Sequence, residues 1–127
     1  MALALCAAVS CTNKSEVAQN GAQSFLDAFL ANDFNTAAAC CTEGFQEEFN
    51  AATESYRNLD GPIKALLQEE CSRYKAEITS LRRVNESDTF LVNYNIVHIA
   101  ADSLQMKKGT INSTLVVVEG KVDKINR

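Results

Sequence analysis

The side chains that could carry out acid–base chemistry in this chain centre on one histidine. His98 lies in an alternating stretch that puts it on the same strand face as Phe90 and Tyr94. Tyr74, on the preceding predicted strand, is expected to share that face. A histidine and a carboxylate held together form a general acid–base pair. Three aspartates are candidates for the carboxylate: Asp27, Asp33 and Asp60.

The sequence positions of these aspartates argue against such a pair. Asp33 and Asp60 are expected to serve as helix-cap and turn residues, and Asp27 leans away from the apolar stripe of its helix. Because no carboxylate is placed beside His98, we expect no catalysis. The alternative role for His98 and Tyr94 is as the polar tip of an amphipathic sheet surface.

The cysteines give no metal-site pattern. Cys40 and Cys41 are adjacent and lack the two-to-four-residue separation with which two sulfurs chelate one zinc from a turn. No sequence pattern indicates that Cys40 or Cys41 clusters with Cys71 and His98. We therefore expect no metal and no cofactor. In an oxidising compartment Cys71 could pair with Cys40 or Cys41. The alternative is that all three are small buried hydrophobic side chains.

The first eleven residues are an uncharged apolar run that ends in small residues and a cysteine, and a polar stretch follows at once. This arrangement is typical of the end of a secretory signal peptide. The tetrapeptide Ala8-Val9-Ser10-Cys11 resembles a bacterial lipobox, in which the cysteine is lipidated and becomes the mature N-terminus. We therefore expect a lipid at Cys11 and a protein anchored to a bacterial envelope membrane, periplasmic or on the surface. No Lys or Arg precedes Cys11, and the alternative is that residues 1–11 form a first strand or helix of the core.

Composition predicts one ordinary globular domain over residues 12–127. The 127-residue chain is 46% hydrophobic and 22% charged, which is too apolar for a disordered tail. Its net charge is -4, with acidic and basic residues interspersed. No basic patch is interleaved with aromatic residues, so we expect no nucleic-acid partner.

The first half of the chain shows helical periodicity. A helix from Ser15 carries an apolar stripe, a second runs from Phe34 to Cys41 behind Asp33 as N-cap, and a third follows Thr42. Pro62 suits the first turn of a fourth helix. The expected buried stripes are Val17, Gly21, Phe25, Ala28 and Phe29, widened by Leu26 and Leu30; then Phe45, Phe49, Ala52 and Tyr56; then Ile63, Leu66, Leu67 and Cys71.

The second half changes to a period of two. Tyr74, Ala76, Ile78 and Ser80 alternate with polar residues, and residues 85–88 form a turn. Strands are expected over residues 89–101, 109–118 and 121–126, with Glu119-Gly120 as a two-residue hairpin loop. Consecutive strands with short turns predict an antiparallel meander, and the separation of helices from strands predicts an α+β fold with the helices packed on the sheet.

This order of elements resembles the cone-shaped superfamily of nuclear transport factor two and ketosteroid isomerase, also called cystatin-like. Two short stretches resemble small cystatin-like lipoproteins of Bacteroidetes: Ala22-Gln23-Ser24-Phe25-Leu26-Asp27-Ala28-Phe29 and Asp33-Phe34-Asn35-Thr36-Ala37. The resemblance implies a helix in the concavity of a curved sheet, often with a pocket at the open end. It implies no particular activity, because the superfamily holds enzymes, binding proteins and scaffolds.

We therefore expect a non-catalytic envelope protein that binds a small apolar ligand in the cone. The candidate ligand-binding residues are Phe25, Phe29, Tyr74, Tyr94 and His98. A protein partner or a second copy on the outer sheet face is the alternative, with Asn93, Asn95, Val97 and Ile99 as that face. A hydro-lyase or isomerase built on His98 is a third hypothesis, and simple core packing of the aromatic residues is a fourth.

Overall fold

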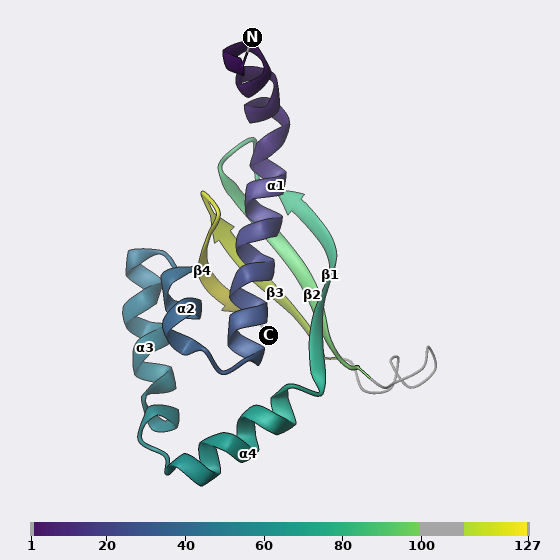
Figure 1. Ribbon diagram of the computed structural model, residues 1–127. Helices are drawn as coiled ribbons and strands as arrows, with labels where there is room; N and C mark the ends of the chain where they lie inside the picture. The colour runs from purple at the N-terminus through teal and green to yellow at the C-terminus, as the bar shows by residue number, and fades with distance from the viewer. Residues whose placement is uncertain (1, 100–110, 127) are drawn as a thin grey trace.

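The structure is a computed structural model that describes the backbone of residues 2–99 and 111–126, and the side chains of residues 14–99 and 113–126. Its elements in order are α1 (Ala2–Leu30), α2 (Phe34–Ala39), α3 (Glu43–Arg57), α4 (Gly61–Cys71), β1 (Tyr74–Arg83), β2 (Thr89–His98), β3 (Ile111–Val118) and β4 (Lys121–Asn126). The predicted α+β fold is confirmed: four helices precede one antiparallel sheet, and α1 lies across the sheet (Figure 1). The side chain of Cys11 and residues 100–110, on which parts of the expected anchor and strands fall, lie outside the described residues.

Short-range capping contacts fix where the helices begin. The Asp33 carboxylate accepts hydrogen bonds from the backbone N–H of Thr36 at 3.3 Å and from its hydroxyl at 2.6 Å. The Thr42 hydroxyl accepts from the backbone N–H of Phe45 at 3.3 Å. Both predicted N-caps are therefore confirmed. Asp60 occupies the N-cap position of α4 without a side-chain bond, and Pro62 lies in the first turn as expected.

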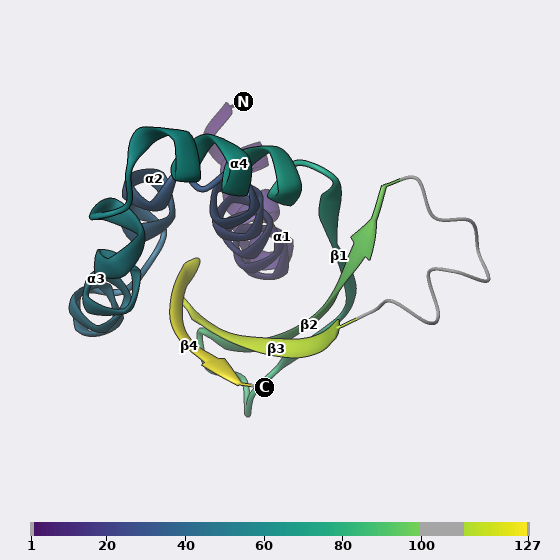
Figure 2. The same cartoon turned by 90° about the horizontal axis from the view of Figure 1, so that it is seen from below.

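The sheet is the predicted meander, with strand order β1-β2-β3-β4 and each neighbouring pair antiparallel. It curves around α1, which lies in its concavity (Figure 2). The concave face carries Phe90, Val92 and Tyr94 of β2 and Leu115 and Val117 of β3, all buried. These residues form the core together with the inner face of α1.

A β-bulge corrects the expected pattern of β1. The register shifts between Ile78 and Ser80, so that Ile78 pairs with Tyr94 but Leu81 pairs with Val92. An extra residue in one strand moves the following side chains to the opposite face. Leu81 therefore packs against the core, and Ser80, expected on the inner face, is exposed.

The last strand does not end the sheet with a bare edge. The segment between α2 and α3 forms a parallel bridge from Cys41 to Val122. The Val122 N–H donates to the Cys40 carbonyl at 2.8 Å, and the Thr42 N–H donates to the Val122 carbonyl at 2.9 Å. The Thr42 hydroxyl also bonds the Asp123 carboxylate at 2.7 Å. The turn between two helices thus acts as a short additional strand beside β4.

Three expected core stripes are partly wrong. Val17 is 44% exposed, whereas the expected Phe25 and Leu26 are buried and Ala18 and Ala22 join them on the buried face of α1. Helix α4 has no buried residue, and its Leu66 is 66% exposed, with Ile63 and Leu67 also exposed. Amphipathic spacing predicts which side of a helix is apolar, but it does not predict whether another element packs against that side. Ala52 of α3 is exposed for a related reason, since Thr53 takes the buried position.

Candidate functional site

A cavity of about 330 Å³ lies between the C-terminal half of α1 and the concave face of the sheet. Helix α1 contributes one wall and the strands β2, β3 and β4 contribute the other. The lining residues are Phe25, Leu26, Phe29, Leu30, Tyr94, Ile96, Ser113 and Ile125. This volume lies within the range of small-molecule sites, which are typically about 300–1,000 Å³ and mostly apolar.

The helical wall of the cavity is held in place by an aromatic cluster behind it. Phe25 and Phe29 lie one turn apart with ring centroids separated by 5.9 Å. Phe25 also meets Phe49 of α3 edge-on at 5.4 Å. Phe25 is almost fully buried, whereas Phe29 keeps part of its surface open. The cluster therefore fixes the wall while leaving Phe29 free to contact a ligand.

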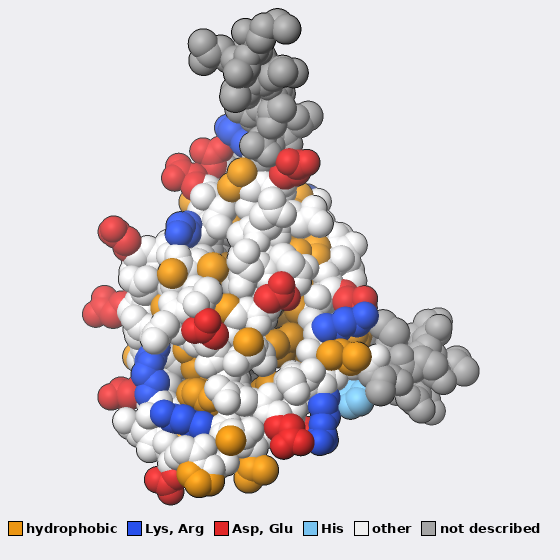
Figure 3. Space-filling view, viewed as in Figure 1, with side chains coloured by type: hydrophobic (Ala, Val, Ile, Leu, Met, Phe, Trp, Pro, Cys, Tyr) orange, Lys and Arg blue, Asp and Glu red, His pale blue; other side chains and the backbone are white. Residues whose placement is uncertain are grey.

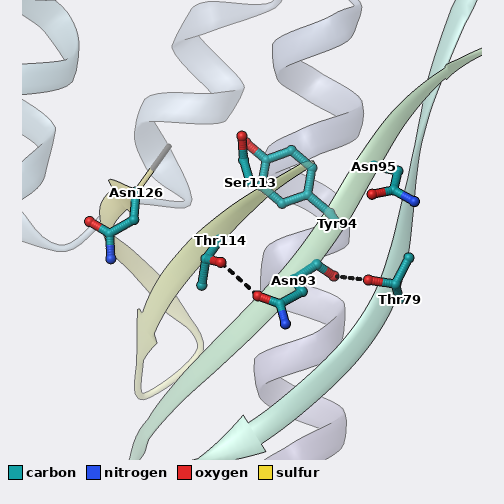
Figure 4. A pocket seen from close by; sticks show the side chains of 7 residues that line it. All are labelled: Thr79, Asn93, Tyr94, Asn95, Ser113, Thr114 and Asn126. Carbon is teal, nitrogen blue, oxygen red and sulfur yellow. Dashed lines mark hydrogen bonds between the residues drawn. The ribbon is translucent and has the colours of Figure 1, made fainter. Parts of the chain in front are cut away.

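The sheet wall supplies the polar groups of the cavity. Tyr94 of β2 and Ser113 of β3 are paired across the sheet, and both side chains are mostly buried. Figure 4 shows the two side chains next to each other, on the side of the strands opposite Asn93 and Thr114. Two neighbouring hydroxyl groups in an apolar cavity can hydrogen-bond one polar group of a bound molecule.

The structure brings together three of the five predicted ligand-binding residues. Phe25, Phe29 and Tyr94 line the cavity, whereas Tyr74 and His98 do not. Those two are paired at the outer ends of β1 and β2, where their rings meet edge-on with centroids 5.2 Å apart. The period of two predicted the correct strand face for His98. His98 nevertheless lies at the end of β2, beyond the residues that line the cavity.

The predicted ligand-binding set leaves out five lining residues. They are Leu26, Leu30, Ile96, Ser113 and Ile125. Periodicity predicted the correct face for Leu26 and Leu30 of α1 and for Ile96 of β2, but it did not show that these residues line a cavity. Ser113 and Ile125 depend on strand pairing between distant segments, which no local pattern reports.

The candidate carboxylates lie away from the cavity. Asp27 is exposed and accepts a hydrogen bond from Gln23 at 2.8 Å, Asp33 caps α2, and Asp60 precedes α4. None of the described residues that line the cavity carries a charge at neutral pH. A molecule bound there would therefore meet aliphatic and aromatic side chains and two hydroxyl groups.

The three described cysteines are free thiols. The Cys41 thiol is buried and donates to the Ala37 carbonyl at 3.4 Å. Burial, reinforced by the nearby thiol of Cys40, raises the pKa of Cys41 from 9.0 to about 12. Among the described residues, no group of three or more His, Cys, Asp or Glu side chains is arranged to hold a metal ion.

A polar hollow of about 400 Å³ lies at the sheet and is lined by Thr79, Asn93, Asn95, Thr114 and Asn126, and also by Tyr94 and Ser113 of the apolar cavity. Asn93 is at its centre: its Nδ2 donates to the Ser80 hydroxyl at 2.7 Å, and its Oδ1 accepts from the Thr114 hydroxyl at 2.6 Å. The Thr79 hydroxyl donates to the backbone carbonyl of Asn93 (Figure 4). This network satisfies the Asn93 side chain within the chain itself.

One residue expected on the outer sheet face is not available to a partner. Val97 is only 1% exposed and lies outside the main core cluster, whereas its neighbour Ile99 is 56% exposed. Alternation assigns a residue to one face of a strand, but it does not tell whether other parts of the chain cover that face. Val97 therefore cannot serve as the docking residue we expected.

Within the described part of the chain, no helix has both the length and the hydropathy needed to cross a membrane. Comparisons with protein-family models, curated proteins and solved structures found no match to this chain.

Proposed function

We propose that the protein is a non-catalytic binding protein for a small, uncharged and mostly apolar molecule, which occupies the cavity between α1 and the sheet. The observation that carries this proposal is the cavity itself, with its apolar walls and one adjacent pair of hydroxyl groups, Tyr94 and Ser113. A ligand with a charged group would have to leave water without meeting an opposite charge, which costs more than burial of its apolar part returns.

The proposed cellular setting is the bacterial envelope. Cys11 would carry the lipid anchor, since the junction at residues 8–11 resembles a lipobox. A lipidated protein would keep its binding domain at the membrane surface, where apolar molecules are concentrated. Several acyl chains would hold it firmly, because each buried methylene contributes about 0.8 kcal/mol.

Native mass spectrometry of the full chain, extracted from its own membranes in mild detergent, tests both proposals. A mass that begins at Cys11 with acyl chains, plus a co-purified small molecule, is the expected result. A lipidated protein without a bound molecule would count against the binding role alone. A mass that includes Met1 and no lipid would contradict the proposed lipid anchor at Cys11.

A cavity-filling variant tests the location of the ligand. Leu30→Trp places a large side chain at the wall of the cavity, whereas Val118→Trp introduces the same side chain on the half-buried outer side of β3. In the unlipidated full chain (Cys11→Ser), Leu30→Trp is expected to weaken binding of the neutral fluorophore N-phenyl-1-naphthylamine at least tenfold, on the order of 1.4 kcal/mol. Equal binding by both variants would place the fluorophore elsewhere.

A protein partner on the outer sheet face is a second candidate function. The observation in its favour is Ile99, a large apolar side chain just after β2 that is 56% exposed. The partner would be another envelope protein or a second copy of this chain. Sedimentation of the full chain in mild detergent would reveal self-association, and Ile99→Lys should abolish it.

A further inference from the structure

The polar hollow at the sheet is lined by hydrogen-bonding side chains that carry no charge. All seven described residues in its lining are Asn, Ser, Thr or Tyr. On the face that the helices form, by contrast, Figure 3 shows acidic and basic side chains scattered over the surface. Because Lys, Arg, Glu and Asp are the residues that proteins most consistently expose to water, a lining without any of them differs from an ordinary solvated surface.

Asparagine is an unfavourable residue in the strands that carry this hollow. Asn93 and Asn95 lie in β2, Asn112 of β3 pairs with Asn95 in register, and Asn126 ends β4. Asparagine is depleted from strands, which favour β-branched and aromatic residues. Since β2 and β3 are the two inner strands of the sheet, strand formation does not explain these asparagines. Residues that oppose the local structure are expected at functional sites.

The centre of the hollow is held in place by bonds to both neighbouring strands. The Asn93 side chain donates to Ser80 of β1 at 2.7 Å and accepts from Thr114 of β3 at 2.6 Å. The Thr79 hydroxyl donates to the Asn93 backbone carbonyl at 3.3 Å. The hydroxyl oxygens of Thr79 and Thr114 each keep lone pairs that can accept a further bond. Polar groups that are already fixed lose little conformational entropy when a ligand binds.

Two further amides at the hollow make no side-chain hydrogen bond within the described part of the chain. They belong to Asn95 and Asn126, and Figure 4 shows no bond from either to the other residues that line the hollow. Each amide offers a donor and an acceptor side by side. Glu77, the register partner of Asn95, is ion-paired with Lys75 at 3.5 Å. The hollow therefore presents open donors and acceptors, and its described lining has no charge that would attract an ion.

We propose that this hollow binds a carbohydrate, a neutral molecule with many hydroxyl groups. A hydroxyl both donates and accepts, so two adjacent hydroxyls of a sugar ring match the acceptor and the donor of one asparagine amide. A charged ligand would leave water without meeting an opposite charge, and an apolar ligand would leave these polar groups unpaired. The volume of about 400 Å³ lies in the range of small-molecule sites. Carbohydrate binding here does not depend on a ligand in the apolar cavity, although Tyr94 and Ser113 line both.

The test is a titration of the isotopically labelled full chain (Cys11→Ser) with the neutral disaccharides maltose, lactose and cellobiose. The side-chain NH₂ signals of Asn93, Asn95 and Asn126, followed by NMR, are expected to shift together and to saturate with one dissociation constant for at least one sugar. The exposed Asn20 of α1 is the internal control and should not respond. Signals that stay unchanged, shift without saturation or move together with Asn20 for all three sugars would mean that water alone fills the hollow and would overturn the proposal.

Two substitutions assign the contacts and separate binding from folding. Asn95→Val and Asn126→Val each remove an amide and introduce a residue that strands favour. Each is expected to weaken binding of the responding sugar about three- to tenfold, with a urea midpoint of unfolding that is equal or higher. Thr89→Val, the matched control, changes a residue of β2 outside the hollow and should leave binding unchanged. Unchanged binding in both asparagine variants, or an equal loss in Thr89→Val, would overturn the proposal.

Discussion

Gly21 of α1 and Gly120 of the β3–β4 turn are in direct backbone contact. A Cβ atom on Gly21 would lie 2.1 Å from the carbonyl oxygen of Gly120. A Cβ atom on Gly120, whose φ is 81°, would lie 2.6 Å from a methyl group of Val17. The helix and the hairpin can therefore approach each other this closely because both contacting residues, Gly21 and Gly120, lack a side chain.

Gly21→Ala is expected to destabilise the protein by about 1–3 kcal/mol, because the helix or the hairpin must move to admit the methyl group. The same change at an unconstrained helical glycine usually stabilises by about 0.5–1 kcal/mol. Gly44→Ala is the matched control, since nothing lies within 4 Å of its added Cβ. Urea unfolding of both variants measures the difference; a stabilised Gly21→Ala would contradict the close contact.

Removal of the Tyr94 hydroxyl should affect only ligands that carry a polar group. Tyr94→Phe is expected to lower the affinity for naphthol about three- to tenfold and to leave the affinity for naphthalene unchanged, because one hydrogen bond is lost and the ring remains. Tyr74→Phe is the control, as Tyr74 lies outside the cavity against His98. Fluorescence titration gives both affinities. An equal loss for both ligands would mean that Tyr94 acts through packing alone.

Val97 and Ile99 should respond in opposite ways to the same substitution. Val97→Lys buries a charge opposite Lys75 of β1 and should cost about 2–4 kcal/mol in urea unfolding. Ile99→Lys changes an exposed position and should alter stability by less than about 0.5 kcal/mol. Comparable losses in the two variants would show that Ile99 is also covered in the native protein.

The Cys41 thiol should make stability depend on pH in the alkaline range. Its pKa is raised by burial from 9.0 to about 12, so the folded state holds a proton that the unfolded state releases. This contribution is fully present below pH 9.0 and is lost as the pH rises towards about 12. Unfolding at several pH values, compared with Cys41→Ala, isolates the effect from other groups that titrate there. A constant difference between the two proteins across this range would contradict the raised pKa.

Local sequence predicted the parts of this fold that depend on neighbouring residues. Asp33 and Thr42 cap their helices as expected, because the capping bond spans only three residues. Glu119-Gly120 forms the expected hairpin turn, and both residues have positive φ. The order of strands followed from the same short turns.

Features that depend on distant segments were not predictable in this way. The bulge after Ile78 moves Leu81 inward because of how β1 pairs with β2, and the spacing of β1 alone contains no sign of it. Leu66 has the spacing of a core residue, yet no other element covers it. In the candidate site, Phe25, Phe29 and Tyr94 were predicted from periodicity, while Ser113 enters only through its pairing with Tyr94.

The bridge between Cys41 and Val122 also limits how copies of this protein can join through their sheets. A sheet with two bare edges can add strands at both sides and grow into a fibre. Here the β4 edge is already paired at Val122 with the chain's own segment before α3, which makes β1 the more open edge for pairing between copies. Pairing through that one edge gives a closed pair, whereas a continuous array would also need the partly occupied β4 edge.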